Sequence, residues 1–391
     1  MTTSTVALGK IAKITSGGTP ARENPSYWNG DIPWVKTTQV QNCVIRIADI
    51  DKRITEEGSR RSSAKMIPAG SILMAMVGQG KTRGQVAVLD IAAAINQNCA
   101  AIILKDGADR NYVYQQLRFR YEEIRNASKS SGQQNLNAAI IRSLRIPLPS
   151  YAAQKRIGLW LVEWDSAIEK TEQLIAVKER HYTHQLSRII SQGQHPHSHV
   201  GKFAHEVSER NRGGNEARVL SVTNSRGFVL PEDQFERRVA SADLSNYKAV
   251  TRGQYAYNPS RINVGSIARL DDWDLGVVSP MYVVFGLNET KTNSDYFLHW
   301  LDSHEARERI KKSAQGSVRE TVSFTEFAAI VFPLPDITKQ AAIARYLNAL
   351  RDEISTLNVY VEKLKEQKRG LMQKLLTGQW RVPMEGNEGA A

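Results

Sequence analysis

The residues closest to a chemical motif are Gly78-Gln79-Gly80-Lys81-Thr82, which match the end of a phosphate-binding loop. That loop has the pattern G-x-x-x-x-G-K-[ST] between a strand and a helix, so that backbone N–H groups and a helix N-terminus surround the phosphate. Here Ala75 stands where the first glycine belongs, and the residues after Thr82 have the pattern of a strand. The sequence therefore argues against ATP binding. It favours a loop in which Lys81 and Arg83 contact the phosphates of a nucleic acid.

Two further patterns fall short of a reactive site. Asn258-Pro259-Ser260-Arg261 approaches the N-P-P-[FY] signature of adenine methyltransferases but lacks the second proline and the aromatic residue. His181 and His184 lie three residues apart on an expected helix, which is half of a metal site, but no cysteine or acidic cluster joins them. We therefore expect no catalytic residue, no metal and no cofactor on this chain.

The charge balance indicates a polyanionic partner. The 391 residues carry 52 basic and 40 acidic side chains, a net charge of +12. Residues 1–150 hold 20 basic and 11 acidic side chains, whereas residues 193–335 hold 17 of each. With two cysteines, no secretory signal and no long apolar run, the sequence predicts a cytoplasmic protein of two or three domains.

An internal repeat organises the chain. Ile146-Pro147-Leu148-Pro149 recurs as Phe332-Pro333-Leu334-Pro335, an offset of 186 residues (333 minus 147), and the same offset places Gln154 on Gln340. Since proline is tolerated at the start of a helix, both segments predict that a helix begins there.

Both expected helices are long and follow a heptad pattern. In the second, apolar residues step by four and three over more than four heptads, as in a coiled coil. No domain of ordinary size could bury such a stripe, so we expect the two helices to pack on each other as an antiparallel pair with pseudo-twofold symmetry. The expected interface residues are Leu161, Trp164, Ile168, Ile175 and Tyr182 in the first helix, and Leu347, Leu350, Ile354, Leu357, Val361 and Leu364 in the second.

The segments before the two helices, about 1–150 and 196–335, have the pattern of mixed α/β domains. Short β-rich runs alternate with Gly, Asn and Pro turns, and each segment has one helical stretch before its Pro-Leu-Pro. A polar linker, Ser191–His199, is expected after the first long helix. The expected strands include Ser71–Val77, Gln85–Leu89, Ala100–Leu104 and Val277–Phe285, and the expected helices are Tyr112–Ile124 and Asp295–Lys311.

Together these features resemble the specificity subunits of type I restriction–modification systems. Gly17-Gly18-Thr19-Pro20 and residues 27–34 (YWNGDIPW) are similar to the start of a recognition domain in that family, and both Pro-Leu-Pro segments are similar to its end. The resemblance implies a mixed α/β fold with two target-recognition domains and two long antiparallel coiled-coil helices. The implied boundaries are 1–150 for the first recognition domain, 151–192 for the first long helix, 193–335 for the second recognition domain, 336–380 for the second long helix and 381–391 for a disordered tail.

The resemblance also implies a function. The chain would read a bipartite, asymmetric sequence in double-stranded DNA, and two methyltransferase subunits and restriction/translocase subunits would assemble on it. Those partners would use S-adenosylmethionine, ATP and Mg and carry the catalysis, with no membrane involved. The residues expected to contact DNA are Thr19, Lys36, Thr37, Gln39, Lys81, Arg83, Gln133 and Asn135 in the first half, and Tyr257, Asn258, Arg261, Asn263 and Arg319 in the second.

Two alternatives to this interpretation stay open at this point. One is a coiled-coil adaptor that binds protein only and carries its basic charge incidentally. The other is a DNA enzyme whose site the sequence does not reveal.

Overall fold

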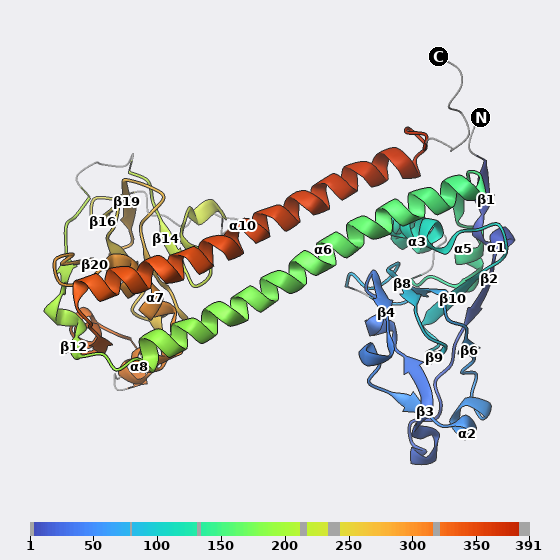
Figure 1. Cartoon of the computed structure of the whole chain (residues 1–391), viewed down its shortest axis with the longest axis horizontal. Coiled ribbons are helices and arrows are strands. Elements are labelled where there is room, and N and C mark those ends of the chain that lie inside the picture. Colours follow the sequence, from blue (N-terminus) through green and yellow to red (C-terminus); the bar gives the residue numbers. More distant parts are fainter. Residues whose placement is uncertain are drawn as a thin grey trace. The chain divides into compact units, whose positions relative to one another are not determined.

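A computed structural model describes residues 4–78, 80–130, 134–211, 217–233, 243–315 and 321–382 (Figure 1). The chain divides into two compact units. Unit 1 comprises Met1–Thr171 and Tyr360–Ala391, and unit 2 comprises Glu172–Val359. Each unit combines sheets with helices, so the expected mixed α/β fold with long helices is confirmed.

The central sheet of unit 1 has five strands in the order β2-β10-β7-β8-β4. The first four run antiparallel to their neighbours, and β4 is parallel to β8. Ile72 and Met74 of β7 pack into one core cluster with α3, whereas Leu73 and Ala75 pack into a second cluster on the other face. Burial on both faces explains why these strands read as continuous apolar runs. The strands are β2 (Ala12–Ser16), β10 (Cys99–Leu104), β7 (Ile72–Ala75), β8 (Val86–Leu89) and β4 (Cys43–Ile45).

A second sheet, the strand pair β1–β11 and short helices complete the globular part of unit 1 within the described residues. The second sheet has the order β5-β3-β9-β6, in which β3 and β9 are parallel. The predicted helix Tyr112–Ile124 is wrong as one element, because the chain leaves the helix at Arg120 and starts another at Tyr121. The remaining elements are β1 (Thr5–Ala7), β3 (Trp28–Val35), β5 (Arg53–Ile54), β6 (Met66–Ile67), β9 (Ala93–Ile95), β11 (Arg145–Pro147), α1 (Leu8–Ile11), α2 (Glu56–Arg60), α3 (Arg110–Phe119), α4 (Tyr121–Ser130) and α5 (Ala138–Ser143).

Unit 2 repeats this plan. Its four-stranded sheet has the order β13-β20-β17-β18, all antiparallel, which corresponds strand for strand to β2-β10-β7-β8. The elements are β12 (His197–His199), β13 (Ala204–Val207), β14 (Ser221–Thr223), β15 (Gly227–Val229), β16 (Lys248–Thr251), β17 (Tyr255–Tyr257), β18 (Ile267–Arg269), β19 (Leu275–Val278), β20 (Val283–Leu287), β21 (Val331–Pro333), α7 (Ser294–Asp302), α8 (His304–Gln315) and α9 (Phe324–Ala328).

Three local predictions for unit 2 are corrected. The expected strand Val277–Phe285 is the end of β19 and the start of β20, which belong to different pairings. The expected helix Asp295–Lys311 is interrupted at Ser303, whose hydroxyl accepts a hydrogen bond from the backbone of Ala306 at 3.1 Å. The expected linker Ser191–His199 ends in a strand, because β12 pairs with β21.

The long helices are α6 (Tyr151–Leu186) and α10 (Ile337–Leu376), each labelled in Figure 1. Within unit 1, Lys368 of α10 contacts Asp165 of α6 at 2.5 Å, and within unit 2, Lys178 contacts Glu353 at 2.7 Å. In unit 1 a residue late in α10 thus contacts a residue early in α6, and in unit 2 a residue earlier in α10 contacts a residue later in α6. The two helices are therefore antiparallel. Of the expected interface residues, Leu161, Ile175, Leu347, Val361 and Leu364 are buried, and Trp164, Ile168, Tyr182, Leu350, Ile354 and Leu357 are half-buried.

The repeated glutamines join each globular part to its long helix in the same way. Gln154 of α6 accepts from the backbone N–H of Asp109 at 3.0 Å, and Gln340 of α10 accepts from that of Asn293 at 2.8 Å. Their amide groups donate to the carbonyls of Pro149 and Pro335. Asp109 and Asn293 are the N-caps of α3 and α7, so each glutamine holds the start of a domain helix against the start of a long helix.

Candidate nucleic-acid interface

In unit 1, loops from both sheets meet at one edge. The register pairs Ser16 with Ala100, Ala75 with Cys99 and Met74 with Val86, so the ends of β2 and β7 lie beside the starts of β10 and β8. The parallel strands β3 and β9 also end side by side. We call the segments that leave this edge the loop edge of unit 1: Gly17–Pro20, Lys36–Gln39, Asn96–Asn98, residues 76–78 and 80–85, and Gln134–Leu136.

Backbone contacts link these loops into one surface. The N–H of Gly18 donates to the carbonyl of Ile95 at 2.9 Å, that of Met76 to Asn98 at 2.9 Å, and that of Leu136 to Met76 at 3.0 Å. A Cβ on Gly17 would lie 1.8 Å from the carbonyl oxygen of Ile95, so only glycine permits this approach. The residues that the sequence placed far apart are therefore held together.

The turn between β7 and β8 presents Lys81 and Arg83. Gly78 and Gly84 adopt positive φ angles of 145° and 88° at its two ends. Tyr121 donates its hydroxyl to the carbonyl of Lys81 at 2.6 Å, while the Lys81 side chain is exposed, and Arg83 donates to the carbonyl of Gln134. After this turn the chain enters an antiparallel strand, which does not provide the helix N-terminus that a phosphate-binding loop requires.

Besides Arg83, four of the residues expected to contact DNA have partners within unit 1. Thr37 is buried and donates to Asn96 at 2.9 Å, and the Thr19 hydroxyl donates to Gln97. Lys36 pairs with Asp51 at 2.6 Å, and this hydrogen bond lowers the pKa of the Asp51 carboxyl. The amide of Gln39 accepts from the backbone N–H of Lys36 at 2.8 Å. These four side chains hold the loops of the loop edge through contacts within unit 1.

The exposed side chains of the loop edge include one, Gln97, that the sequence interpretation missed. Lys81, Asn135 and Thr38, the last as part of the expected strand end 36–39, were expected and are exposed, and Gln97 is exposed beside them. The signal for Gln97 was the polar run Asn96-Gln97-Asn98 between the apolar strands β9 and β10. Gln133 lies outside the described residues.

Unit 2 has an equivalent edge. The segment Asn258–Ser266 connects β17 to β18, as the Lys81 turn connects β7 to β8. Val322 donates its N–H to the carbonyl of Pro259 at 3.1 Å, the counterpart of the bond from Leu136 to Met76. Arg261 and Asn263 are exposed on this loop, and Asn258 is half-buried with its side chain accepting from the Ser260 N–H at 3.0 Å. Arg319 lies outside the described residues.

Tyr257 corrects one expected DNA contact. It is the last residue of β17, and no part of its side chain reaches the surface. Its ring packs on Phe327, with centroids 5.3 Å apart, and on Phe285. Burial raises the pKa of its hydroxyl. Tyr257 is therefore a core residue, and the exposed surface begins one residue later.

A hollow of about 800 Å³ adjoins the loop Asn258–Ser266 in unit 2. It is lined partly by the turn between β14 and β15, where Asn224, Ser225 and Arg226 are exposed. Asn263 of the neighbouring loop also lines it. These turn residues were not among those expected to contact DNA.

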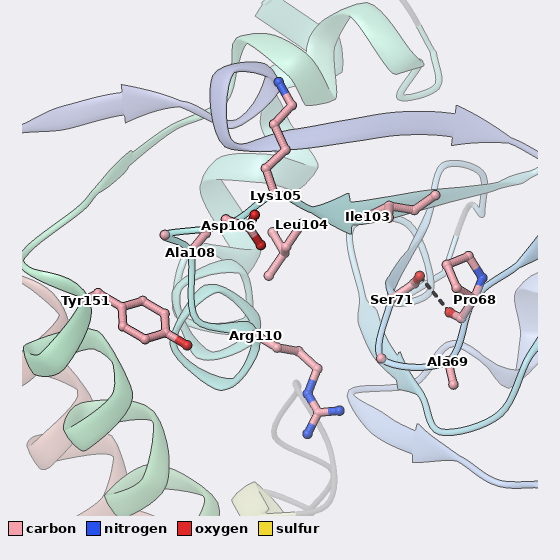
Figure 2. Close-up of a pocket in the computed structure, with 12 residues that line it drawn as sticks. Pro68, Ala69, Ser71, Ile103, Leu104, Lys105, Asp106, Ala108, Arg110 and Tyr151 are labelled. Carbon is pink, nitrogen blue, oxygen red and sulfur yellow. Dashed lines mark hydrogen bonds between the residues drawn. The ribbon is translucent and has the colours of Figure 1, made fainter.

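The structure has another hollow in unit 1, at the opposite end of the central sheet (Figure 2). Its volume is about 290 Å³, and it lies between the turn at Pro68–Ser71 and residues 103–108. Arg110 and Tyr151 stand at its side (Figure 2). Because it opens where β7 begins and β10 ends, it is separate from the loop edge.

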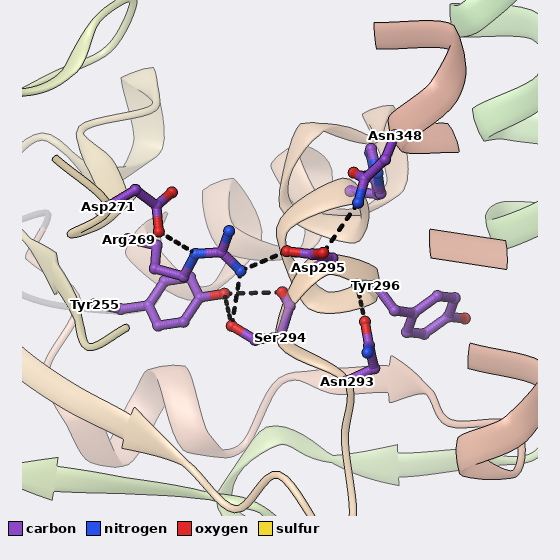
Figure 3. Close-up of polar contacts among 9 residues, drawn as sticks. Tyr255, Arg269, Asp271, Asn293, Ser294, Asp295, Tyr296 and Asn348 are labelled. Carbon is purple, nitrogen blue, oxygen red and sulfur yellow. Dashed lines mark hydrogen bonds and ion pairs between the residues drawn. The ribbon is translucent and has the colours of Figure 1, made fainter. Parts of the chain in front are cut away.

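A polar cluster in unit 2 anchors the sheet to α7 and α10 (Figure 3). Arg269, the last residue of β18, contacts both Asp271 and Asp295 at 2.7 Å, and Asn348 of α10 donates to Asp295 at 2.9 Å. Burial tends to raise the pKa of Asp295, but the bonds from Arg269 and Asn348 outweigh it and hold this pKa below its usual value. Tyr255 donates to the carbonyl of Ser294 at 2.9 Å. The groups pair with one another, so the cluster serves packing.

The histidines and long helices give no sign of a metal or membrane site within the described ranges. His181 and His184 are both exposed on α6. Across residues 4–382, gaps excepted, no three His, Cys, Asp or Glu side chains converge as metal ligands would. Over the same ranges, none of the helices combines the length and apolar character that a membrane crossing requires.

Comparison with known proteins links the chain to one family. Residues 2–179 match the model described as the type I restriction modification DNA specificity domain. The specificity subunit of the type I restriction enzyme EcoR124I/EcoR124II from Escherichia coli is 29% identical over 194 residues, which cover 47% of this chain and 47% of that protein. The MjaIX specificity subunit from Methanocaldococcus jannaschii is 28% identical over 173 residues, covering 44% of this chain and 39% of that protein.

A solved structure extends the likeness to the whole fold. The S subunit of a type I restriction–modification system from M. genitalium matches with a TM-score of 0.61 and 15% identity, covering 97% of this chain and 96% of that chain. The chain spans less than half the length of the two curated relatives that it matches.

Proposed function

Because residues 2–179 belong to the family of type I restriction modification DNA specificity domains, we propose that this chain is the DNA-reading subunit of such a system. The family membership expected from the sequence is confirmed by the matches. Each of the two units would read one half of a bipartite, asymmetric target in double-stranded DNA. The proposed function thus needs two recognition domains that bind different DNA sequences.

The observation that carries this proposal is the equivalence of the two loop edges. The two sheets have the same order of corresponding strands, and corresponding turns present Lys81 in unit 1 and Arg261 in unit 2. Arginine, lysine, asparagine and glutamine on such loops are the side chains that read base edges and contact phosphates. Since the two loops differ in sequence, two different half-sites follow.

We further propose that catalysis belongs to partner subunits. Two methyltransferase subunits and restriction/translocase subunits would assemble on this chain and bind S-adenosylmethionine, ATP and Mg. The β7–β8 turn supports this division, because it leads into a strand and leaves Lys81 without the helix that an ATP phosphate site needs. Exposed apolar side chains on the long helices, including Leu159, Leu174, Val177 and Val359, offer surface for such partners.

The decisive experiment is methylation mapping in cells that contain this chain and its partner methyltransferase. We expect N6-methyladenine at one bipartite sequence, and no methyl transfer by the purified chain alone. A protein-only adaptor would leave no sequence-specific methylation when the chain is present, and methyl transfer without a partner would overturn the division of labour.

Variants at the loop edges would locate the readers. Lys81→Ala with Arg83→Ala should weaken binding to all duplexes, whereas Arg261→Ala should relax the preference at one half-site by roughly 1–3 kcal/mol if it reads a base. The matched control is Lys105→Ala with Arg110→Ala, which removes the same charge at the opposite end of the sheet in unit 1 (Figure 2). Equal losses for both double variants would show that only net charge matters.

A further inference from the structure

A polar contact joins the globular part of unit 1 to its long helices. Arg118, near the end of α3, contacts the carboxylate of Asp165 on α6 at 2.9 Å. Lys368 of α10 contacts the same carboxylate at 2.5 Å, and the amide of Gln115 donates to it at 2.6 Å. At this contact the long helix α6 thus supplies the acidic side chain, and the domain helix α3 supplies a basic one.

Unit 2 has a contact at the same place with the charges exchanged. Asp302, the last residue of α7, accepts from Arg351 on α10. Arg351 also donates to the hydroxyl of Tyr182 on α6 at 2.9 Å and lies over its ring. Tyr182 in turn contacts the Nδ1 of His299 at 2.9 Å. Here the long helix supplies the base and the domain helix the acid.

The repeat shows that these are corresponding positions. The offset from Arg118 to Asp302 is 184 residues (302 minus 118), which equals the offset between the helix caps Asp109 and Asn293. The offset from Asp165 to Arg351 is 186 (351 minus 165), which equals that between Gln154 and Gln340. Tyr182 and Lys368 are also 186 apart, so the third member of each contact corresponds as well.

The rest of the junction is the same in both units. Tyr112 and Tyr296 donate to the carbonyls of Pro147 and Pro333 at 2.9 and 3.1 Å, and the repeated glutamines make matching bonds. These shared contacts would accept either globular domain at either junction. The charged contact is the part of the junction that differs in sign.

We propose that these two ion pairs of opposite arrangement, Arg118–Asp165 in unit 1 and Asp302–Arg351 in unit 2, fix which recognition domain docks on which part of the long helices. They would exclude the arrangement in which the two domains are interchanged. With the domains interchanged, Arg118 would face Arg351 and Asp302 would face Asp165. The side chains of Lys368, Arg118 and Asp165 in unit 1 are 6%, 22% and 31% exposed, whereas those of Arg351 and Asp302 in unit 2 are 36% and 43% exposed. Water therefore screens the charges incompletely in unit 1 and more fully in unit 2. Like charges at this depth repel more strongly than at a free surface. The inference concerns docking within the chain and stands whether or not the chain reads DNA.

The test uses full-length chains in which the two globular domains are interchanged between their closing strand pairs, residues 5–147 for residues 197–333. A second interchanged chain also carries Asp165→Arg, Arg351→Asp, Lys368→Tyr and Tyr182→Lys, so that each long helix matches its new domain. A third carries a control reversal at two exposed helix positions, Glu163→Arg and Arg345→Asp.

The readout is the Tm of thermal unfolding. We expect interchange alone to lower the Tm, the matched helix changes to recover roughly 5 °C or more, and the control reversal to recover nothing. Equal Tm values for the native and interchanged chains would overturn the proposal, as would equal recovery by the matched and control changes.

Native-order variants keep the proposal testable if the interchanged chains do not fold. Each is made in a chain that also carries Lys368→Tyr, because Lys368 contacts position 165 and the corresponding residue of unit 2 is Tyr182. In that chain Arg118→Asp and Asp165→Arg should each lower the Tm, and the variant with both changes should recover much of the loss, because the pair is restored with its sign reversed. A double variant no more stable than the worse single variant would overturn the proposal.

Discussion

His299 of α7 is buried in unit 2, where it contacts α6 and α10, and its titration should make the stability of this unit depend on pH. Its Nε2 donates to the side-chain oxygen of Asn348 at 2.8 Å, so its Nδ1 accepts from the hydroxyl of Tyr182 at 2.9 Å. Burial first, and then the nearby Arg351, lower its pKa from 6.5 to about 4, although the bond to Asn348 and the carboxylate of Asp295 oppose this. The folded state therefore holds a neutral imidazole.

The sign of the pH effect follows from this pKa. Between about pH 6.5 and 4 the unfolded chain binds a proton at His299 that the folded chain does not, so stability falls as the pH falls through this window. At about 1.4 kcal/mol for each pKa unit, the full loss is about 3 kcal/mol near pH 4. For a unit of this size, that loss lowers the Tm by roughly 6–12 °C.

The repeat provides the control for this measurement. Gln115 occupies the position of unit 1 that corresponds to His299, so His299→Gln removes the titrating ring and introduces the side chain found at the sister junction. Hydrogen exchange of α7 should accelerate between pH 6.5 and 4.5 in the wild type relative to the variant, after correction for intrinsic exchange, while α3 behaves alike in both. If the wild type and His299→Gln lose stability equally over this range, the reasoning is wrong.

Three further predictions test other parts of the structure. Lys81→Ala with Arg83→Ala should flatten the dependence of log K on log salt by up to about two units, measured by titration of duplex DNA at several salt concentrations, and an unchanged slope would exclude both as phosphate contacts. Insertion of one heptad after Ile175 and one after Leu357 should lengthen the gap between the methylated half-sites by roughly three base pairs, since seven helical residues rise about 10 Å, and an active variant with the original gap would refute this. Gly17→Ala should lower the free energy of unfolding by about 1–3 kcal/mol, because its Cβ would meet the carbonyl of Ile95, and denaturant unfolding at the wild-type midpoint would contradict that contact.

The repeat and the long helices could be predicted because they depend on local patterns. The Pro-Leu-Pro segments, the glutamine that follows each and the heptad spacing are readable without tertiary contacts. The break at Arg120 could not be predicted, because helix-forming residues continue across it and docking against the sheet decides where the chain turns. The break at Ser303 did have a local signal that the sequence interpretation missed, since serine is a preferred N-cap residue and its hydroxyl accepts from the N–H of Ala306.

The candidate site was predictable only in outline. Lys81 and Asn135 are separated by more than 50 residues, and the sheet register that joins their loops is not visible in sequence. Tyr257 was expected to contact DNA together with Asn258, but burial on both faces of β17 places the tyrosine in the core. The charge exchange between Arg118 and Asp302 needed the structure, since neither residue has its partner nearby in sequence.

The strand pairs that close each globular domain have an evolutionary consequence. β1 pairs with β11, and β12 pairs with β21, so the chain enters and leaves each domain at neighbouring points. Recombination at these two points would replace an entire domain as a cassette without moving the ends of the helices that flank it. A newly acquired cassette would keep its stability only if it carried the appropriate charge at the end of its docking helix, so the junction would filter which foreign domains persist in the lineage.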